Sequence, residues 1–238
     1  MLDAGTGIRR VTGLLDGAAF TGSILLGHLH WDHTQGLPFF AAGDRPDARV
    51  HLYLPAQGDP VEVLSRFMAP PHFPIPPTGL RGSWTFEGLE PGEHELEGFS
   101  VLALDIPHKG GRTFGYRVSD GRSSLAYLSD HNPVSLGEGP AGLGPHHDAA
   151  LRLAEGVDLL VHDAQHTAEE LPAKAAFGHS AAEYALTLAE AAGARRVLLF
   201  HHDPNRTDDE LDELLGRFAE SPVPVTAACE GDVLDLLN

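Results

Sequence analysis

Residues Gly27 to Phe40 read GHLHWDHTQGLPFF, and they follow the apolar run SILL at positions 23–26. Four ligand-type side chains fall within six of these positions: His28, His30, Asp32 and His33. The apolar run predicts a buried strand, so this HxHxDH motif begins where a strand ends. A short loop there can aim alternate side chains at one point and the last two at a second point nearby. The pattern therefore predicts a site for two metal ions.

The ligand types indicate which metals would bind. Neutral imidazole and carboxylate are borderline to hard ligands, which suit Zn²⁺ first, with Mn²⁺ or Fe²⁺ as alternatives. The single cysteine, Cys229, rules out an internal disulfide and leaves too little sulfur for a thiolate cage. One histidine on an apolar strand is more often a core residue than a ligand, but four ligand types this close together favour a metal site.

Length and composition predict one globular domain. The chain has 238 residues and a mass of 25.4 kDa, and it contains no linker long enough to separate two domains, so we expect a single domain over residues 1–238. No apolar run approaches the roughly 18 residues of a membrane span, so we expect a soluble protein with no membrane partner. The first residues, MLDAGTGIRR, lack a charged leader followed by an apolar core, which predicts a cytoplasmic location.

The charge balance bears on partners. The chain has 34 acidic and 16 basic residues and a formal charge of −18. Such a field repels polyanions unless cations or basic groups are focused at one site, which argues against long nucleic acids as partners.

The order of the expected elements predicts the fold class. Strands dominate from Gly98, and the dipeptide Asp120-Gly121 predicts a hairpin turn between two of them. Strands and helices then alternate: Ser180 and Glu183 form a predicted capping box that opens a helix through Ala192, and Thr207 with Glu210 forms a second box. The Pro-rich stretch 68–77 must be a loop, because proline disfavours helices and central strands. This order predicts a layered α/β sandwich.

The motif HLHWDH with the following GLPFF resembles the signature of the metallo-β-lactamase superfamily. Three further segments match that family's ligand segments: His108 in IPHKGGRTFGYRV, Asp130 closing LAYLSD, and His201 closing VLLFHHDP. The resemblance runs from Leu2 to about Asp235. It implies a four-layer αββα sandwich, in agreement with the element order.

The resemblance also implies the ligand sets. One metal would take His28, His30 and His108, and the other would take Asp32, His33 and His201. Asp130 and a hydroxide would bridge the two metals. Because side chains alternate along a strand, only one of His201 and His202 can face the site, and His201 is preferred because it aligns with the family position. His131 would lie behind a ligand or at the surface.

Two downstream segments favour one branch of the superfamily. The segments LLVHDAQHTAEE and FGHSAAEYA resemble the HEAT-type strand and GHS motif of tRNase Z and its smaller phosphodiesterase relatives. By this analogy His179 lies near the scissile phosphate, and its place ahead of a helix N-terminus favours anions. The alternative is an ordinary residue ahead of a helix cap. His162 and Asp163 map to the strand end beneath the site, where Asp163 could orient a ligand imidazole.

The chain departs from tRNase Z in two ways. Only residues 109–129 separate His108 from Asp130, which leaves no room for the long tRNA-binding arm of that family. With the negative charge, this disfavours tRNA and favours a small phosphodiester such as a cyclic nucleotide. The edge hairpin that usually precedes the segment LDAGTGIRR is also missing, and we hypothesise a late start or a truncation, which the mass of protein made from its native locus would test.

The resemblance thus implies a dinuclear metal-dependent phosphodiesterase in which a metal-bridging hydroxide attacks phosphorus. Asp32 would be both ligand and proton acceptor, and His179 would stabilise the transition state or protonate the leaving oxygen. Two alternative roles, a contact to phosphate or a plain surface position, apply to Lys109, Arg112 and Arg117. Two alternative roles, a pocket wall or core packing, apply to Phe39, Phe40, His72 and Phe73.

Other functions fit the same cage. A lactonase or thioesterase would use the same metals on a carbonyl ester, and a non-catalytic metal-binding sensor would bind them without turnover. A redox di-iron role is disfavoured because the flavodiiron branch has Glu where this chain has His30. Relatives often dimerise, so a homodimer is a further expectation.

Overall fold

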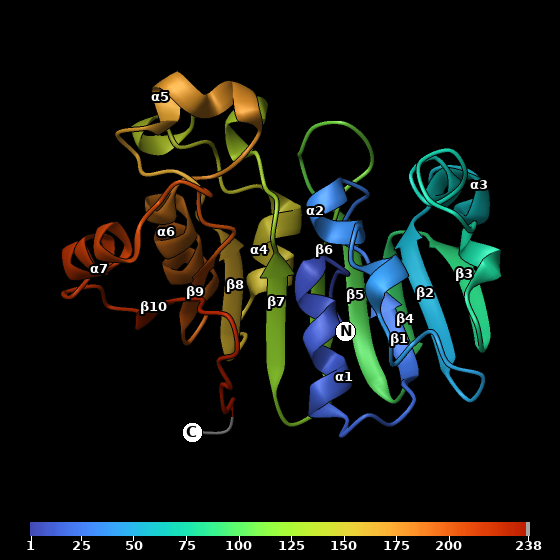
Figure 1. Cartoon of the computed structure of the whole chain (residues 1–238). Coiled ribbons are helices and arrows are strands. Elements are labelled where there is room, and N and C mark those ends of the chain that lie inside the picture. Colours follow the sequence, from blue (N-terminus) through green and yellow to red (C-terminus); the bar gives the residue numbers. More distant parts are fainter. Residues whose placement is uncertain (237–238) are drawn as a thin grey trace. The chain divides into compact units, whose positions relative to one another are not determined.

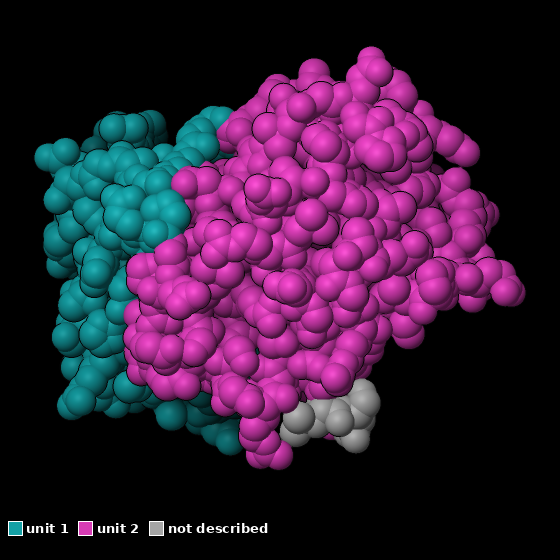
Figure 2. All heavy atoms as spheres, turned by 180° about the vertical axis from the view of Figure 1, so that it is seen from behind, with its two compact units in different colours: residues 1–91, 110–112 teal, residues 92–109, 113–238 magenta. Residues whose placement is uncertain are grey.

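The computed structural model describes residues 1–236, and they form two compact units. Unit 1 comprises residues 1–91 and 110–112, and unit 2 comprises residues 92–109 and 113 onward (Figure 2). Within the described residues, every helix is too short or too polar to cross a membrane. Each unit is built around its own sheet (Figure 1).

Unit 1 contains a three-stranded parallel sheet in the order β1-β2-β3. The strands are β1 (Thr21–Leu25), β2 (Arg49–Pro55) and β3 (Ser83–Leu89). Because the strands are parallel, their carboxyl ends lie at the same edge of the sheet. The HxHxDH segment follows β1 at that edge, as the sequence predicts.

Short helical segments connect these strands and cover their apolar residues. They are η1 (Thr6–Arg10), α1 (Val11–Leu14), α2 (Trp31–Thr34), η2 (Leu37–Phe39), α3 (Pro60–Ser65) and η3 (Pro77–Gly79). Ile24, Phe40, Leu52 and Leu64 are almost completely buried between them. The Pro-rich stretch forms neither α-helix nor strand, which confirms the expected loop.

Unit 2 contains a seven-stranded sheet in the order β10-β9-β8-β7-β6-β5-β4. Its strands are β4 (Gly92–Leu96), β5 (Phe99–Asp105), β6 (Phe114–Ser119), β7 (Ser124–Leu128), β8 (Leu159–Asp163), β9 (Val197–Phe200) and β10 (Val225–Ala227). Strands β4 to β7 pair antiparallel, and β7 to β10 pair parallel. The predicted turn at Asp120-Gly121 joins β6 and β7. Since β5 runs in the same direction as β7, β8 and β9, the carboxyl ends of these four strands share one edge.

The helices of unit 2 are α4 (Asp148–Ala154), α5 (Leu171–Lys174), α6 (Ala182–Ala192) and α7 (Asp208–Arg217), with 3-10 turns η4 (Pro133–Leu136), η5 (Pro140–Gly142) and η6 (Ala175–Phe177). Helices α4 and α6 contact each other and the sheet. Leu128 and Leu160 from the strands are fully buried, as are Leu153 and Leu188 from these helices. This apolar packing fixes the strand ends that carry polar side chains.

The capping prediction is right at α7 and wrong at α6. The Thr207 hydroxyl accepts the Glu210 N–H at 3.3 Å, and the Glu210 carboxylate accepts the Thr207 N–H. The capping box is therefore complete. At α6 the residue before the helix is Ala181, with no side-chain cap. A bridge to His166 replaces the cap, because the Ala182 N–H donates to the His166 carbonyl at 2.9 Å. Tertiary backbone pairing thus satisfies a donor in the first turn of this helix, and Ser180 forms no side-chain cap.

Close backbone contact fixes the N-terminal segment against the residues that follow the HxHxDH motif. The Ala4 N–H donates to the His33 carbonyl at 2.8 Å, and the Gly36 N–H donates to the Ala4 carbonyl at 2.9 Å. A methyl group on Gly36 would lie 2.0 Å from the Gly5 carbonyl oxygen. Only glycine fits at position 36, so this contact depends on that residue.

We expect Gly36→Ala to lower the free energy of unfolding by about 2 kcal/mol or more, because the added methyl must displace backbone. Gly13→Ala is the matched control, since Gly13 lies in α1 with nothing within 4 Å of an added methyl, and it should be neutral or stabilise by about 0.4–1 kcal/mol. Urea unfolding followed by circular dichroism measures both. Equal stability of the two variants would contradict this reading of the contact.

Candidate metal centre

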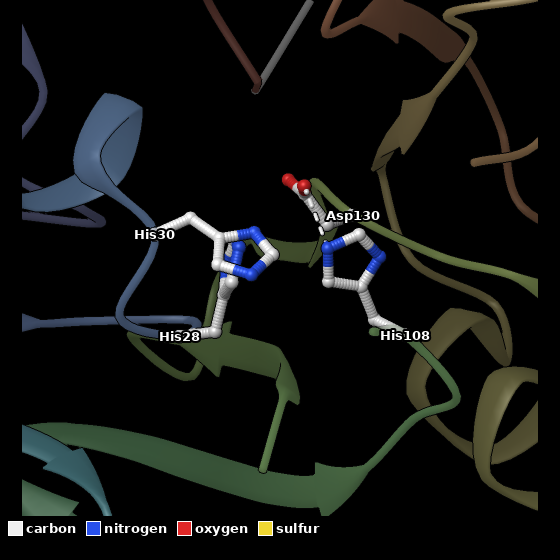
Figure 3. Close-up of side chains that lie close together, drawn as sticks. All are labelled: His28, His30, His108 and Asp130. Carbon is white, nitrogen blue, oxygen red and sulfur yellow. Dashed lines mark ion pairs between the residues drawn. The ribbon is translucent and has the colours of Figure 1, made fainter. Parts of the chain in front are cut away.

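Three imidazole rings crowd together at the end of β1 in unit 1. The His28 ring centroid lies 4.4 Å from that of His30 and 4.3 Å from that of His33, and His28 is only 2% exposed. Figure 3 draws His28 and His30. Rings this close would repel one another if all were protonated, whereas their neutral forms offer nitrogen lone pairs to a cation.

His33 is oriented by an aspartate that the sequence analysis did not identify. The His33 Nδ1–H donates to Asp3 Oδ2 at 2.7 Å, which leaves Nε2 as the lone-pair nitrogen. Asp32 Oδ2 lies 3.2 Å from that Nε2. Asp3 Oδ1 also accepts the Gly27 N–H at 2.6 Å, so the carboxylate is held at both oxygens. A carboxylate behind a histidine is the usual support of a metal-binding imidazole.

Asp130 is the centre of the polar cluster in unit 2. Its carboxylate is 1% exposed, with Oδ2 3.4 Å from His108 Nε2 and Oδ1 3.3 Å from His201 Nε2. Figure 3 marks the ion pair between His108 and Asp130. These separations exceed a usual N–H···O distance of about 2.9 Å, while both nitrogens face one carboxylate. The three residues follow β5, β7 and β9, whose carboxyl ends share an edge.

Both histidines have a second contact on the far ring nitrogen. The His108 Nδ1–H donates to the Gly178 carbonyl at 2.8 Å, which leaves Nε2 toward Asp130. The Gln165 side-chain amide lies 3.0 Å from His201 Nδ1. His201 has a positive φ of 56°, an unusual backbone conformation for a side chain of this size. His202, the alternative ligand, belongs to no metal-capable group among the described residues, so the geometry favours His201.

His179 pairs with Asp163 at the same edge. The His179 Nδ1–H donates to Asp163 Oδ2 at 2.9 Å, and Asp130 Oδ2 lies 3.8 Å away. The His179 ring stacks on the His201 ring with centroids 4.9 Å apart. Asp163, His179 and His201 each offer a ligand atom within 4.8 Å of the other two. Asp163 therefore orients His179, which the sequence analysis placed near the scissile phosphate.

Backbone groups hold Asp163 in place. The His131 N–H donates to Oδ2 and the Gln165 N–H to Oδ1, both at 3.0 Å. With the His179 contact, the buried carboxylate accepts three hydrogen bonds. Such a carboxylate is rigid, which gives the His179 ring a defined direction.

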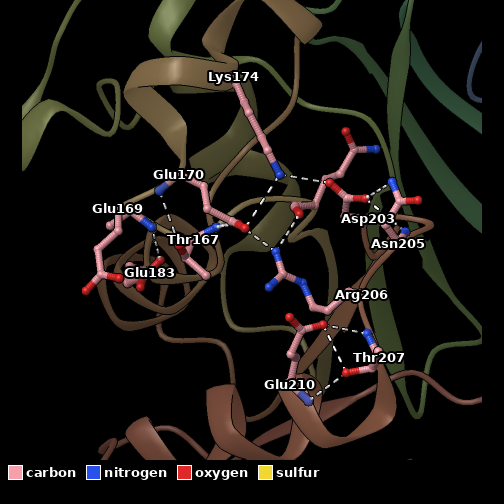
Figure 4. Close-up of polar contacts among 12 residues, drawn as sticks. Thr167, Glu169, Glu170, Lys174, Glu183, Asp203, Asn205, Arg206, Thr207 and Glu210 are labelled. Atoms are coloured by element: carbon pink, nitrogen blue, oxygen red, sulfur yellow. Dashed lines mark hydrogen bonds and ion pairs between the residues drawn. The ribbon is translucent and has the colours of Figure 1, made fainter.

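An ionic network in unit 2 anchors the segments that carry Gln165 and His201 (Figure 4). Arg206 donates to Glu170 at 2.6 Å and to the Gln165 carbonyl at 3.2 Å. Lys174 pairs with Asp203, two residues after His201, at 3.0 Å. The Asn205 backbone N–H and then Lys174 hold the pKa of Asp203 at about 2. Asp203 therefore stays charged at neutral pH, and the segment after β9 stays tied to α5.

A chain of three imidazoles lies behind this edge, and two of them, His131 and His162, are fully buried. The Asp163 carbonyl can only accept, so His162 Nδ1–H donates to it at 2.7 Å, and His162 Nε2 must accept from His131 Nδ1–H at 2.9 Å. His131 Nε2 then accepts from His147 Nε2–H at 2.8 Å. Burial lowers the pKa of His162 to about 4 and holds that of His131 well below its usual value. The chain is neutral, and every tautomer in it is fixed.

Other residues singled out from the sequence have contacts of their own. Lys109 donates to the Ala176 carbonyl, Arg112 pairs with Glu90 at 3.0 Å, and Arg117 donates to the Glu155 carbonyl. These contacts agree with surface roles. Among the candidate pocket walls, Phe40 is fully buried in the core, and Phe39 is 60% exposed and forms a T-shaped pair with Phe73. His72 is exposed in the Pro-rich loop.

The donor set fits divalent cations. Imidazole nitrogens and carboxylate oxygens gather at one sheet edge in each unit, and two of the imidazoles have their Nδ1 bound by Asp3 or Gly178, so that Nε2 is the lone-pair atom. This is the arrangement of nitrogen and oxygen ligands that Zn²⁺ and similar ions require. The chain therefore has groups of histidine and aspartate side chains that could bind metal.

The chain belongs to the beta-lactamase superfamily, because the model of the beta-lactamase superfamily domain matches residues 2–202. Within that superfamily it is a tRNase Z- and phosphodiesterase-like hydrolase. Ribonuclease Z from Listeria monocytogenes serotype 4b (strain CLIP80459) is 27% identical over 234 residues, covering 81% of this chain and 74% of the relative.

Solved structures agree on the fold. The metallo-beta-lactamase fold protein YhfI from Bacillus subtilis superposes with a TM-score of 0.70 at 19% identity, covering 97% of this chain and 84% of that chain. A diphosphatase from the PhnP family gives 0.70 at 21% identity, covering 98% and 78%. Human tRNase Z, short form, gives 0.67 at 20% identity, covering 99% and 87%. The predicted fold class is confirmed, with mixed α/β content and sheets flanked by helices.

Removing the carboxylate behind His33 should weaken metal binding. We expect Asp3→Ala to lower zinc affinity by about 10- to 100-fold, because the ring loses the acceptor that fixes its tautomer. Competition with a chromogenic chelator measures the affinity. Asp59→Ala is the control: Asp59 caps α3 through the Glu62 N–H at 2.9 Å, so its loss should cost about 1 kcal/mol of stability without changing zinc affinity. Unchanged affinity in Asp3→Ala would refute the supporting role.

Acid should destabilise the metal-free protein through the imidazole chain. His162 has a pKa of about 4 when folded and about 6.5 when unfolded, so the unfolded state alone binds its proton between these values. Stability should be independent of this group above pH 6.5 and fall by about 3 kcal/mol as the pH drops to 4. Urea unfolding from pH 7.5 to 4.5 measures the slope. His162→Gln should be less stable at pH 7.5 but show a shallower slope, and a slope as steep as that of the wild type would contradict the assignment.

Proposed function

We propose that the chain is a dinuclear metal-dependent hydrolase of small phosphodiesters, such as cyclic nucleotides. The single observation that carries this proposal is the Asp163–His179 pair at 2.9 Å, with His179 Nδ1 3.8 Å from Asp130. A phosphodiester needs a group that stabilises charge or donates a proton at its leaving oxygen. A histidine held by a buried carboxylate at the metal-capable edge has the chemistry for that role.

The proposed ligands of the two ions follow from the family resemblance. One ion would be held by His28, His30 and His108, and the other by Asp32, His33 and His201, with Asp130 shared. Zinc suits this nitrogen and oxygen set first, with manganese or iron as alternatives. We also propose that residues 1–238 act as one functional domain. The family match over residues 2–202 supports this assignment.

The chain's own residues divide the chemical roles. Divalent cations, when bound, supply an acidified water and positive charge that offsets the charge on phosphate. Asp32, whose side chain is 56% exposed beside His33, would accept a proton from the attacking water. In its imidazolium form His179 would donate its Nε2 proton to the leaving oxygen and keep its Nδ1 proton on Asp163. The three hydrogen bonds to Asp163 would keep that geometry fixed during turnover.

The β6–β7 connection and the charge favour a small substrate over tRNA. Strand β6 ends at Ser119 and β7 begins at Ser124, so a short turn fills the region between His108 and Asp130. The formal charge of −18 opposes a long polyanion. We propose a small phosphodiester as the partner and a cytoplasmic location.

We expect metal-loaded protein to hydrolyse bis(p-nitrophenyl) phosphate or a 2′,3′- or 3′,5′-cyclic nucleotide, and His179→Ala to lower kcat by about 10²-fold or more, because it removes the proton donor. Steady-state kinetics with metal content measured on the same samples tests this. His94→Ala on β4, an edge strand of the sheet that carries β8, is the matched control and should keep full activity.

The panel also includes a lactone, a thioester and a tRNA precursor. Turnover of a lactone or thioester alone would replace the proposal with a carbonyl ester hydrolase. Cleavage of the tRNA precursor alone would assign the site to RNA. Full metal content with no turnover of any ester would indicate a metal sensor.

A further inference from the structure

Unit 1 contains a cavity of about 240 Å³ beside His28. Its lining includes Trp31, Gln57, Arg66, Phe67 and Gly111. The parallel pairing of β1 and β2 explains the location, because residues following both strands lie at the same edge of the sheet. Ligand pockets are typically about 300–1,000 Å³, so this cavity accommodates one ring system rather than a whole ligand.

Two aromatic side chains line the cavity. Trp31 lies between His30 and Asp32 in sequence and is 71% exposed, although an indole is usually largely buried. Phe67 follows α3 and is half-buried. An exposed indole beside a candidate metal ligand is suited to stacking against a planar ring brought by a ligand, which contributes about 1–3 kcal/mol per base in nucleic-acid sites.

Arg66 adds a positive charge to the same cavity. It is exposed at the end of α3, and no acidic side chain of residues 1–236 pairs with its guanidinium. Some other arginines of unit 1 are paired, such as Arg81 with Asp44 at 3.0 Å and Arg112 with Glu90 at 3.0 Å. In a chain of charge −18, an arginine without an acidic partner at this position attracts an anionic ligand.

Gln57 contributes a donor of fixed direction. The Arg112 backbone N–H donates to Gln57 Oε1 at 3.1 Å, so the amide oxygen faces the backbone and the Nε2 hydrogens are the end left to serve a ligand. A methyl on Gly111 would lie 3.0 Å from this oxygen, and Gly111 has a φ of 149°, so glycine keeps the contact open. Nε2 can donate to an acceptor on the edge of a base.

We infer that this cavity is a base-binding subsite, which makes the substrate class a nucleotide. The base stacks against Trp31 and Phe67, Gln57 Nε2 donates to its edge, and Arg66 pairs with phosphate oxygen. The inference rests on the proposed function, because it assigns the group attached to the phosphodiester. It requires the protein to prefer a phosphate carrying an aromatic base over the same phosphate without one.

Binding in the metal-loaded protein tests this without turnover. Trp31 and Trp84 are the two tryptophans, so a Trp84→Phe protein reports Trp31 fluorescence alone. We expect adenosine 5′-monophosphate to quench this emission and to bind about tenfold or more tightly than ribose 5-phosphate. Calorimetry then compares variants: Trp31→Ala should remove the preference for the base, and Arg66→Gln should weaken both ligands about tenfold.

Two exposed residues of unit 1 that do not line the cavity are the matched controls. Phe39→Ala removes an aromatic ring that is 60% exposed, and Arg49→Gln removes an exposed arginine on β2, and both should keep wild-type affinities. Equal affinity for the two ligands in the wild type would overturn the inference. So would a base preference that survives Trp31→Ala.

The outcome separates the subsite from the catalytic proposal. Hydrolysis of bis(p-nitrophenyl) phosphate with no preference for the base would remove the subsite and leave the phosphodiesterase proposal standing. A base preference lost in Trp31→Ala, with no hydrolysis of any phosphodiester, would retain the subsite and remove the phosphodiesterase.

Discussion

The strands that carry the site residues run in the same direction within each sheet, so their carboxyl ends meet at one edge. In unit 2 this edge brings together Asp130, Asp163 and His201, although more than thirty residues separate each from the next in the sequence. In unit 1 the same constraint places the HxHxDH segment beside the residues that follow β2. The direction of the strands, more than any single contact, determines which polar groups share a site.

Contacts from distant parts of the chain give these two edges their precision. Asp3 holds His33, the Gly178 carbonyl holds His108, and Asp163 holds His179. The neutral imidazole chain begins at the Asp163 carbonyl, which accepts a hydrogen bond from the His162 Nδ1–H. Because the tautomers in that chain determine one another, the backbone around Asp163 has one hydrogen-bonding arrangement. Such a rigid support suits a reaction that depends on where a single proton is held.

The sequence predicts much of the fold and part of the site. The density of ligand types from His28 to His33, the turn at Asp120-Gly121 and the cap at Thr207 are local patterns, and the structure contains all three. The cap assigned to Ser180 is wrong because a bridge to His166 satisfies the helix donor. Local pattern cannot reveal that a donor will find a partner far away in the sequence.

The same limit explains the residues that the sequence analysis missed. Asp3 supports His33 across thirty positions, and the partner of Gln57 is the backbone of Arg112. Phe40, for which a pocket wall and core packing were both open, is a core residue, whereas Phe67 lines the cavity. All of them are ordinary residue types whose roles depend on long-range pairing, which becomes visible only once the strands are assembled.

The separation of the cavity residues from the ligand residues has an evolutionary consequence. In unit 1 the ligand-type side chains come from the segment after β1, while Gln57, Arg66 and Phe67 come from the segment between β2 and β3. Substitutions or insertions in that second segment can change what the cavity accepts without moving a ligand. Proteins with this architecture can therefore acquire new ligand preferences through changes in the β2–β3 connection. The ligand-type side chains after β1 stay the same.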